Sequence, residues 1–316
     1  MLRRMARWFG LSVVVAVLLL AAFAFYLRHP SGDPIAVLPQ NQEPVRATLL
    51  EEFHEDDRLI QRHRIEDPAL GEVGLVVSLP EPLPEQPLPL VVVLGGLGSG
   101  LSTIRQLPPA GDNIVVGYDW PLPDKLPRGV DFLRQGPALY ERVLTVPGQI
   151  AAVIAWAAAQ PWAEPDRISL LTFSLGAMAA PAAQRLLQAQ GGQVAWTVLA
   201  YGGADLGSLA ESHPRIRRHW VSPLVGWIAD FYFGPLDPAV HLPHLSGRFL
   251  VIGGEDDGLV PEDAARLMEE LAPEPKRVVR LVGDHIGVGG GQEALMAEIL
   301  AVVESWLKEQ GAVNPR

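Results

Sequence analysis

Short, unbroken runs of apolar residues recur along this chain and alternate with longer stretches in which apolar positions repeat with helical spacing. Apolar runs of about four to eight residues are typical of strands covered on both faces of a sheet. Such runs predict strands at Leu90–Leu94, Ile114–Gly117, Ile168–Leu171, Val194–Tyr201, Phe249–Ile252 and Val278–Val282. Helices are predicted at Ala138–Gln160, Met178–Ala189, Pro261–Leu271 and Gln292–Glu309. This alternation predicts an α/β protein with a doubly wound, mostly parallel sheet.

Two regions depart from the alternation. The first holds three extended segments: Val45–Phe53 and Leu59–Glu66, which can pair around a polar turn at Glu55-Asp56-Asp57, and then Val73–Leu79. The second, residues 203–247, carries five aromatic residues among prolines and four histidines. We expect this second region to form a cap inserted between two strands of the sheet.

The N-terminus differs from the rest of the chain in hydropathy. Residues 8–27 are uncharged, and the run is about long enough to cross a bilayer as a helix. Arg3, Arg4 and Arg7 precede it, which places the N-terminus in the cytoplasm and the rest of the chain outside, in the periplasm if the source is bacterial. The alternative is a cleaved signal peptide with a small-x-small site at Ala22-Phe23-Ala24.

These patterns predict three parts of the chain. Residues 1–29 form a cytoplasmic tip and a transmembrane anchor, residues 30–44 form a proline-containing linker, and residues 45–316 form one large domain that includes the cap.

Charge and composition exclude several classes of protein. The net charge is −11 and the basic residues form no stripe, so nucleic acid is not an expected partner. The absence of cysteine excludes a disulfide, a thiol nucleophile and a thiolate metal site. The cap contains four histidines: His213, His219, His241 and His244. No pair of them has a recognised metal-ligand spacing with a carboxylate. We therefore predict neither a metal nor another cofactor.

The predicted strand at Ile168–Leu171 leads through Thr172-Phe173-Ser174-Leu175-Gly176-Ala177 into a predicted helix. A strand that turns sharply into a helix through a serine flanked by small residues presents a nucleophilic hydroxyl at the edge of a sheet. The first small position holds Thr172 where glycine is usual. The alternative is an ordinary strand–turn–helix in which Ser174 caps the helix.

Other chemistry-bearing residues also follow predicted strands. A turn containing Glu255, Asp256 and Asp257 follows one strand, and Gly283-Asp284-His285 follows the last strand. The glycine-rich segment 95–100 follows an earlier strand and offers backbone amides to an anion. In an open parallel sheet these loops meet at one edge, so a nucleophile, an acid, a base and anion donors would come together. Taken singly, an acidic turn before a helix is more often an N-cap, and a histidine beside glycines is usually a surface loop residue.

Two of these segments resemble a known family. The segment Gln160–Ile168 followed by Thr172–Ala177 is similar to the approach to the nucleophile in dienelactone-hydrolase-like and prolyl-oligopeptidase-like α/β hydrolases. The segment Gly254–Pro261 resembles the acid loop of these enzymes, with its aspartate four residues before the proline.

The resemblance implies an α/β-hydrolase fold and a set of roles. Ser174 would be the nucleophile, Asp257 the acid and His285 the base, and the backbone N–H groups of Leu97 and Leu175 would form the oxyanion hole. Departures from the family pattern are Thr172 and also Gly95, where many members have histidine. Glu255 or Asp256 could replace Asp257, and Asp205 is a weaker substitute.

The function expected from the sequence is that of a membrane-anchored, outward-facing serine hydrolase that needs no cofactor. It would cleave an ester-like bond in a small-molecule or lipid acyl substrate through an acyl-Ser174 intermediate. Trp220, Trp227 and Phe231 of the cap are candidates to bind an apolar acyl group. The alternative is a catalytically silent hydrolase fold that acts as a binding or scaffolding protein in the cell envelope.

Overall fold

The computed structural model describes residues 15, 32–96, 98–107, 110–123, 130–287 and 292–315. The chain divides into two compact units, Met1–Val37 and Leu38–Arg316. In the first unit a short 3-10 helix, η1, spans Pro34–Val37. The second unit begins inside the predicted linker, and Leu38 is already buried.

The predicted membrane segment, residues 8–27, lies outside the described residues except for Val15. Across the residues that are described, no helix combines the length and the apolar character needed to cross a bilayer.

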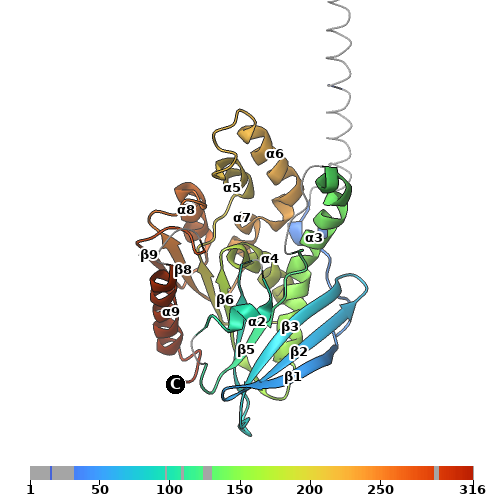
Figure 1. Ribbon diagram of the computed structural model, residues 1–316, viewed down its shortest axis with the longest axis vertical. Helices are drawn as coiled ribbons and strands as arrows, with labels where there is room; N and C mark the ends of the chain where they lie inside the picture. The colour runs from blue at the N-terminus through green and yellow to red at the C-terminus, as the bar shows by residue number, and fades with distance from the viewer. Residues whose placement is uncertain are drawn as a thin grey trace, which may run out of the picture. The chain divides into compact units, whose positions relative to one another are not determined.

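The described strands of the second unit form one nine-stranded sheet in the order β1-β2-β3-β5-β4-β6-β7-β8-β9 (Figure 1). The strands are β1 (Ala47–Glu55), β2 (Arg58–Asp67), β3 (Gly71–Pro80), β4 (Leu88–Leu94), β5 (Ile114–Tyr118), β6 (Ala163–Phe173), β7 (Trp196–Ala200), β8 (Arg248–Gly254) and β9 (Lys276–Leu281). All pairs from β5 through β9 are parallel. The α/β class and the mostly parallel sheet predicted from the sequence are therefore confirmed.

The first three strands form an antiparallel extension that joins the parallel part through β3 and β5. The turn between β1 and β2 is the predicted polar one, and Asp56 adopts a φ of 52° there. Aspartate tolerates this left-handed conformation better than most residues. The local sequence therefore explains why the chain reverses at this point.

Helices cover both faces of the sheet. They are α2 (Gly100–Ile104), α3 (Val130–Ala158), α4 (Leu175–Ala189), α5 (Leu206–Ser212), α6 (Ser222–Phe233), α7 (Pro238–His241), α8 (Glu262–Leu271) and α9 (Gln292–Glu309). Helix α9 packs through Ile299 and Val303 against a core that includes Val198 of β7. The preceding residue of β7, Thr197, points to the opposite face and donates to Oε1 of Gln184 on α4 at 2.9 Å. Coverage on both sides explains why β4 is buried along its whole length.

The long connection from β7 to β8 is helical and forms the cap. It contains α5, α6 and α7 together with two 3-10 helices, η2 (Gly234–Leu236) and η3 (Leu242–His244). Helices α5 and α6 are the uppermost labelled helices in Figure 1. Gly226 of α6 lies so close to α5 that a β-carbon there would be 3.0 Å from the backbone oxygen of Gly207. The small residues of the cap therefore set how closely its two main helices approach.

Candidate active site

Ser174 occupies the sharp turn between β6 and α4. Its φ of 51° and ψ of −116° lie in a backbone region that residues other than glycine rarely adopt. Two residues on, a β-carbon at Gly176 would be 2.4 Å from the backbone oxygen of Leu94. Only glycine permits this contact between α4 and β4, so the second small position of the serine motif has a direct steric reason.

Thr172 stands at the first small position of the motif. Its side chain is fully buried, and Oγ1 donates to the backbone oxygen of Val198 on β7 at 2.5 Å. The hydroxyl is thus satisfied by the neighbouring strand. A threonine fits here because it is turned toward β7 and forms part of the packing of the sheet.

The structure brings Ser174, His285 and Asp257 together. Oγ of Ser174 lies 2.7 Å from Nε2 of His285, and Nδ1 of His285 lies 2.8 Å from Oδ2 of Asp257. The side chains of His285 and Asp257 are only 5% and 6% exposed. An ionised carboxylate can only accept, so Nδ1 donates to Asp257 and Nε2 of the neutral ring accepts the hydroxyl of Ser174. The serine, base and acid are therefore linked in one chain of hydrogen bonds.

The loop after β8 holds Asp257 by its other oxygen. Oδ1 accepts the backbone N–H groups of Leu259 and Val260 at 2.8 and 2.9 Å. Glu255 and Asp256, the two alternatives from the sequence, are exposed to solvent. Of the three carboxylates in this turn, the structure brings Asp257 to the histidine.

Asp205, the fourth candidate acid, has a different role. It is the N-cap of α5, and its Oδ1 accepts the backbone N–H of Ser208 at 2.9 Å. It therefore stabilises the first turn of the cap.

Asp284 is a residue of this site that the sequence did not single out. Its Oδ1 accepts the backbone N–H of Gly258 at 2.8 Å and that of His285 at 2.7 Å. These two donors lower the pKa of Asp284. The carboxylate thereby connects the acid loop to the loop that carries the base. The sequence shows that Asp284 precedes His285, but it does not show which backbone groups the Asp284 carboxylate binds.

Tyr201 is another neighbour that sequence reasoning missed. Its ring meets the ring of His285 edge-on, with centroids 5.9 Å apart. Burial, followed by the negative charges of Asp257 and Glu298, raises the pKa of Tyr201 to about 12. The ring thus stays neutral and packs against one side of the imidazole.

One of the two expected oxyanion donors can be located. Leu175 is the first residue of α4, so its N–H has no partner within the helix and lies directly after Ser174. Leu97, the other expected donor, lies outside the described residues. Its neighbour Gly96 lines the same pocket as Ser174.

No protein-family model matches this chain, and no curated protein matches it. Solved structures of esterases do match it in fold. Acetyl xylan esterase from Paenibacillus sp. R4 aligns with a TM-score of 0.60 and 16% identity, over 86% of this chain and 99% of that protein. Acetyl xylan esterase 1 from Thermoanaerobacterium sp. JW/SL YS485 aligns with a TM-score of 0.58 and 14% identity, over 88% of this chain and 92% of that one. An esterase from Pyrobaculum calidifontis covers 93% of each chain, with a TM-score of 0.53 and 18% identity.

The chain has the α/β-hydrolase fold. At these identities the likeness is one of fold.

Two pockets of this α/β-hydrolase fold adjoin the serine turn. The first, of about 520 Å³, contains Ser174 and His285 and is also lined by Gly96, Phe173 and Met296. The second, of about 230 Å³, lies between the core and the cap and has an almost wholly apolar wall. Its lining comprises Trp120, Leu122, Val143, Val146, Pro147, Leu175, Met178, Ala179, Leu206, Phe233 and Leu236. Leu175 lines both pockets, so the nucleophile lies beside the boundary between them.

The structure does not bring Trp220, Trp227 and Phe231 to either pocket. Trp220 is 90% exposed, and the ring of Phe231 packs against that of Trp227, with centroids 5.3 Å apart. The cap contributes Phe233 and Leu236 to the apolar pocket instead. The aromatic composition of the cap indicated its apolar character, but not which of its aromatic side chains face inward.

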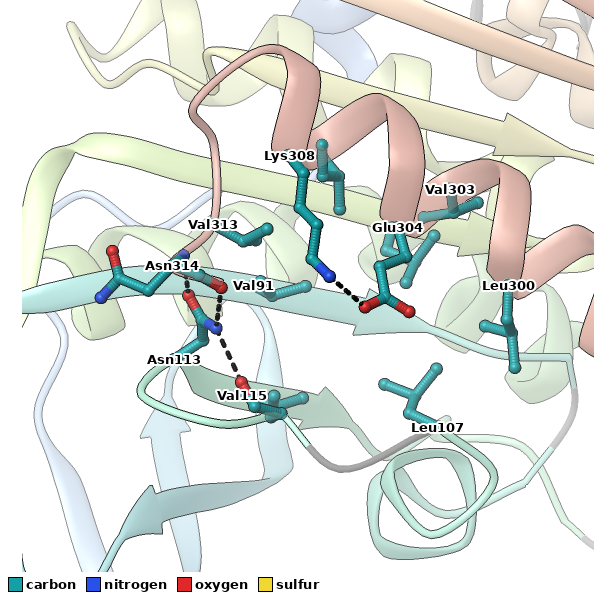
Figure 2. A pocket seen from close by; sticks show the side chains of 13 residues that line it. Val91, Leu107, Asn113, Val115, Leu300, Val303, Glu304, Lys308, Val313 and Asn314 are labelled. Carbon is teal, nitrogen blue, oxygen red and sulfur yellow. Dashed lines mark hydrogen bonds and ion pairs between the residues drawn. The ribbon is translucent and has the colours of Figure 1, made fainter. Parts of the chain in front are cut away.

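A third apolar cavity, of about 90 Å³, lies between α9 and the sheet (Figure 2). Its wall includes Val91 and Val303, and a 2.7 Å ion pair between Lys308 and Glu304 lies at its edge. Neither Ser174 nor His285 lines it. We therefore regard it as part of the packing of α9.

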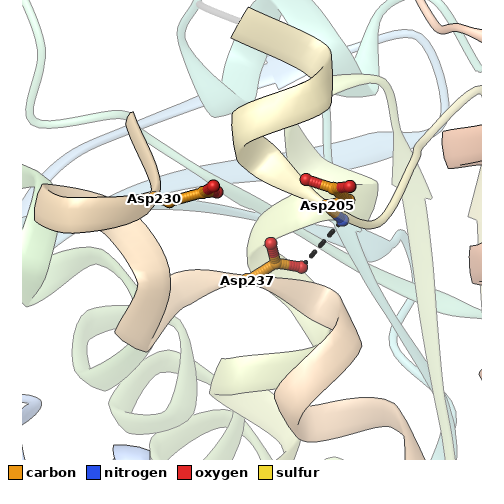
Figure 3. A group of neighbouring side chains, drawn as sticks. All are labelled: Asp205, Asp230 and Asp237. Carbon is orange, nitrogen blue, oxygen red and sulfur yellow. Dashed lines mark hydrogen bonds between the residues drawn. The ribbon is translucent and has the colours of Figure 1, made fainter. Parts of the chain in front are cut away.

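One group of side chains with metal-ligating atoms occurs among the described residues: Asp205, Asp230 and Asp237 (Figure 3). Asp237 is already engaged, because its carboxylate accepts the backbone N–H groups of Asp205, Leu206 and Ala239 at 2.7 to 3.0 Å. Asp205 likewise caps α5. These bonds hold the starts of α5 and α7 together. They give two of the three carboxylates, those of Asp205 and Asp237, a structural role. None of the four histidines of the cap belongs to the group.

Proposed function

We propose that this chain is a serine hydrolase that cleaves esters of apolar carboxylic acids through an acyl-Ser174 intermediate. The observation that carries the proposal is the pair of hydrogen bonds from Ser174 to His285 (2.7 Å) and from His285 to Asp257 (2.8 Å). The fold is shared with solved esterases and is consistent with this chemistry. Fold alone does not specify a reaction, so the argument depends on the site.

The roles follow from the geometry. His285 accepts the proton of Ser174 as Oγ attacks the carbonyl carbon, and Asp257 stabilises the imidazolium that forms. The N–H of Leu175 donates to the carbonyl oxygen as it becomes an anion. His285 then passes the proton to the leaving alcohol, and the acyl group stays on Ser174. Water, deprotonated by the same histidine, releases the acid and restores the serine.

The two pockets divide the substrate between them. The leaving group must lie within reach of Nε2 of His285, which lines the larger pocket but not the apolar one. The acyl side of the substrate therefore extends past Leu175 into the apolar pocket. A pocket of about 230 Å³ with so few polar atoms favours an aliphatic or aromatic acyl group over a sugar or a peptide.

Labelling with a fluorophosphonate tests the proposal directly. The detergent-solubilised full chain should be labelled on Ser174, and Ser174→Ala should remove the label without changing the far-ultraviolet circular dichroism. Hydrolysis of p-nitrophenyl esters should be lost in the same variant. Failure to label the folded chain, or equal labelling of Ser174→Ala, would contradict the proposal. Failure to label the folded chain is what the alternative of a catalytically silent fold predicts.

A further inference from the structure

The outer side of the cap carries large apolar side chains that face solvent. Five of the twelve exposed large apolar side chains in the described part of the chain lie within residues 220–232. We call them the apolar face of the cap: Trp220, Leu224, Trp227, Ile228 and Tyr232. Their exposed fractions range from 40% to 90%. Clusters of this kind on a folded domain mark an interaction surface.

Helix α6 has the reverse of the usual distribution of apolar side chains. Its buried residues are small: Ser222, Gly226 and Ala229. The close contact with α5 requires small side chains, because a β-carbon at Gly226 would already be 3.0 Å from the backbone of that helix. Leu224, Trp227 and Ile228 lie three and four residues apart and share the opposite side. An ordinary surface helix buries its large apolar residues and exposes its polar ones.

Positive charge lies next to this face in the sequence. Arg215, Arg217 and Arg218 precede α6 and are exposed. None of the three forms an ion pair with a carboxylate in the described part of the chain. Asp230, the acid of α6, is exposed, and its side chain points toward Asp205 and Asp237 (Figure 3). A chain with a net charge of −11 thus has three neighbouring cations next in sequence to the largest group of exposed large apolar side chains in the described residues.

We propose that the apolar face of the cap inserts into the interfacial region of a bilayer that contains anionic lipids, with the three arginines at the headgroups. Tryptophan and tyrosine favour the interface, and apolar side chains flanked by arginine are typical of interfacial binding. Here α6 supplies most of the apolar side chains and the segment before it supplies the arginines. A second copy is disfavoured as the occupant, because a two-fold contact would bring two arginine clusters together.

The length of the chain before the second unit is compatible with this arrangement. Only residues 28–37 separate the apolar run 8–27 from Leu38. As an extended chain these ten residues span at most about 36 Å. If the run anchors the chain as the sequence predicts, the domain stays close to a membrane surface.

The absence of cysteine makes the proposal easy to test. A single Leu224→Cys substitution in the full chain can be labelled with the environment-sensitive fluorophore NBD without background. Leu50→Cys on β1 is the matched control, because Leu50 and Leu224 are both 53% exposed. Each labelled chain is reconstituted into vesicles of phosphatidylcholine alone or of phosphatidylcholine with phosphatidylglycerol, and far-ultraviolet circular dichroism checks that it is folded.

We expect NBD emission at position 224 to rise roughly threefold in the anionic vesicles relative to detergent solution, since the interface excludes water from inserted side chains. The probe at position 50 should not respond. Replacing Arg215, Arg217 and Arg218 with glutamine should remove most of the rise. The proposal would be overturned by an unchanged signal at position 224 or by an equal rise at position 50. An equal rise at position 224 in neutral vesicles would also overturn it. A rise in detergent that grows with protein concentration would also overturn it, because a second copy would then cover the face.

Discussion

Asp284 and Gly258 are joined by a 2.8 Å hydrogen bond from the backbone N–H of the glycine to Oδ1 of the aspartate. The same oxygen accepts the N–H of His285 at 2.7 Å. The loop that carries Asp257 and the loop that carries His285 are thus held together by a side chain that does not touch the serine. We interpret Asp284 as a positioning residue for the pair.

Removing this acceptor should affect turnover more than binding. We expect Asp284→Ala to lower kcat for an ester substrate about tenfold with KM within about twofold, because a small displacement of the base is costly. Asp284→Asn keeps an oxygen at the same place and should restore most of kcat. Steady-state kinetics of the two variants provide the test. A fall in thermal stability with unchanged kcat would mean that the residue is only structural.

The choice among the three neighbouring carboxylates can be tested by two single substitutions. Asp257→Asn preserves an acceptor for Leu259 and Val260 but places an amide against Nδ1 of His285, which favours the wrong tautomer. We expect kcat/KM to fall about 10³- to 10⁴-fold. Asp256→Asn removes an exposed charge from the same loop and should change kcat/KM by less than about twofold. A large loss in Asp256→Asn would instead assign the acid to that position.

The apolar pocket can be made shorter without changing the reacting groups. Ala179 lies on its wall, one turn of α4 beyond Leu175. Ala179→Leu should raise KM for esters of long acyl chains by about tenfold and leave acetyl esters unchanged, since each excluded methylene costs binding energy. Ala189→Leu, at the exposed end of the same helix, is the control. Equal effects on short and long esters would place the acyl group elsewhere.

The acidic group in the cap gives stability a pH dependence. Burial, together with the carboxylates of Asp205 and Asp237, raises the pKa of Asp230. An acid whose pKa is raised on folding destabilises the fold when it is ionised, and this cost disappears as the pH falls below the unfolded value near 4. We therefore expect Asp230→Asn to raise Tm by about 1–3 °C at pH 7 and by less at pH 4.

Thermal unfolding followed by circular dichroism at the two pH values measures this difference. Asp166→Asn removes one exposed charge from the other end of the domain and serves as the control. A gain for Asp230→Asn that is as large at pH 4 as at pH 7 would contradict the electrostatic explanation.

The central strands β4 to β8 could be predicted from the sequence because they are covered on both faces and therefore appear as unbroken apolar runs. Helix α9 was predicted with the bounds that the structure has. Helix α3 begins at Val130, eight residues before its predicted start. Pro137 lies just before that predicted start, inside the observed helix, and a proline is usually taken as a helix boundary.

The candidate site could be predicted only in part. Ser174, Asp257 and His285 each follow a strand. Their positions therefore predicted that they would meet at one edge of the sheet. Which carboxylate of a consecutive group turns inward depends on backbone hydrogen bonds that composition does not reveal. The orientation of α6 was equally hidden, because the requirement for small residues against α5 is a property of the packed helices.

The backbone of Ser174 has a consequence for the alternative of a silent fold. A non-glycine residue at a φ of 51° and a ψ of −116° carries strain of about 1–3 kcal/mol, which glycine would relieve. Ser174→Gly should therefore give a more stable chain that cannot form an acyl intermediate. A protein that served only as a scaffold would gain stability by giving up this hydroxyl. The strained turn is thus a cost that the proposed reaction at Ser174 would offset.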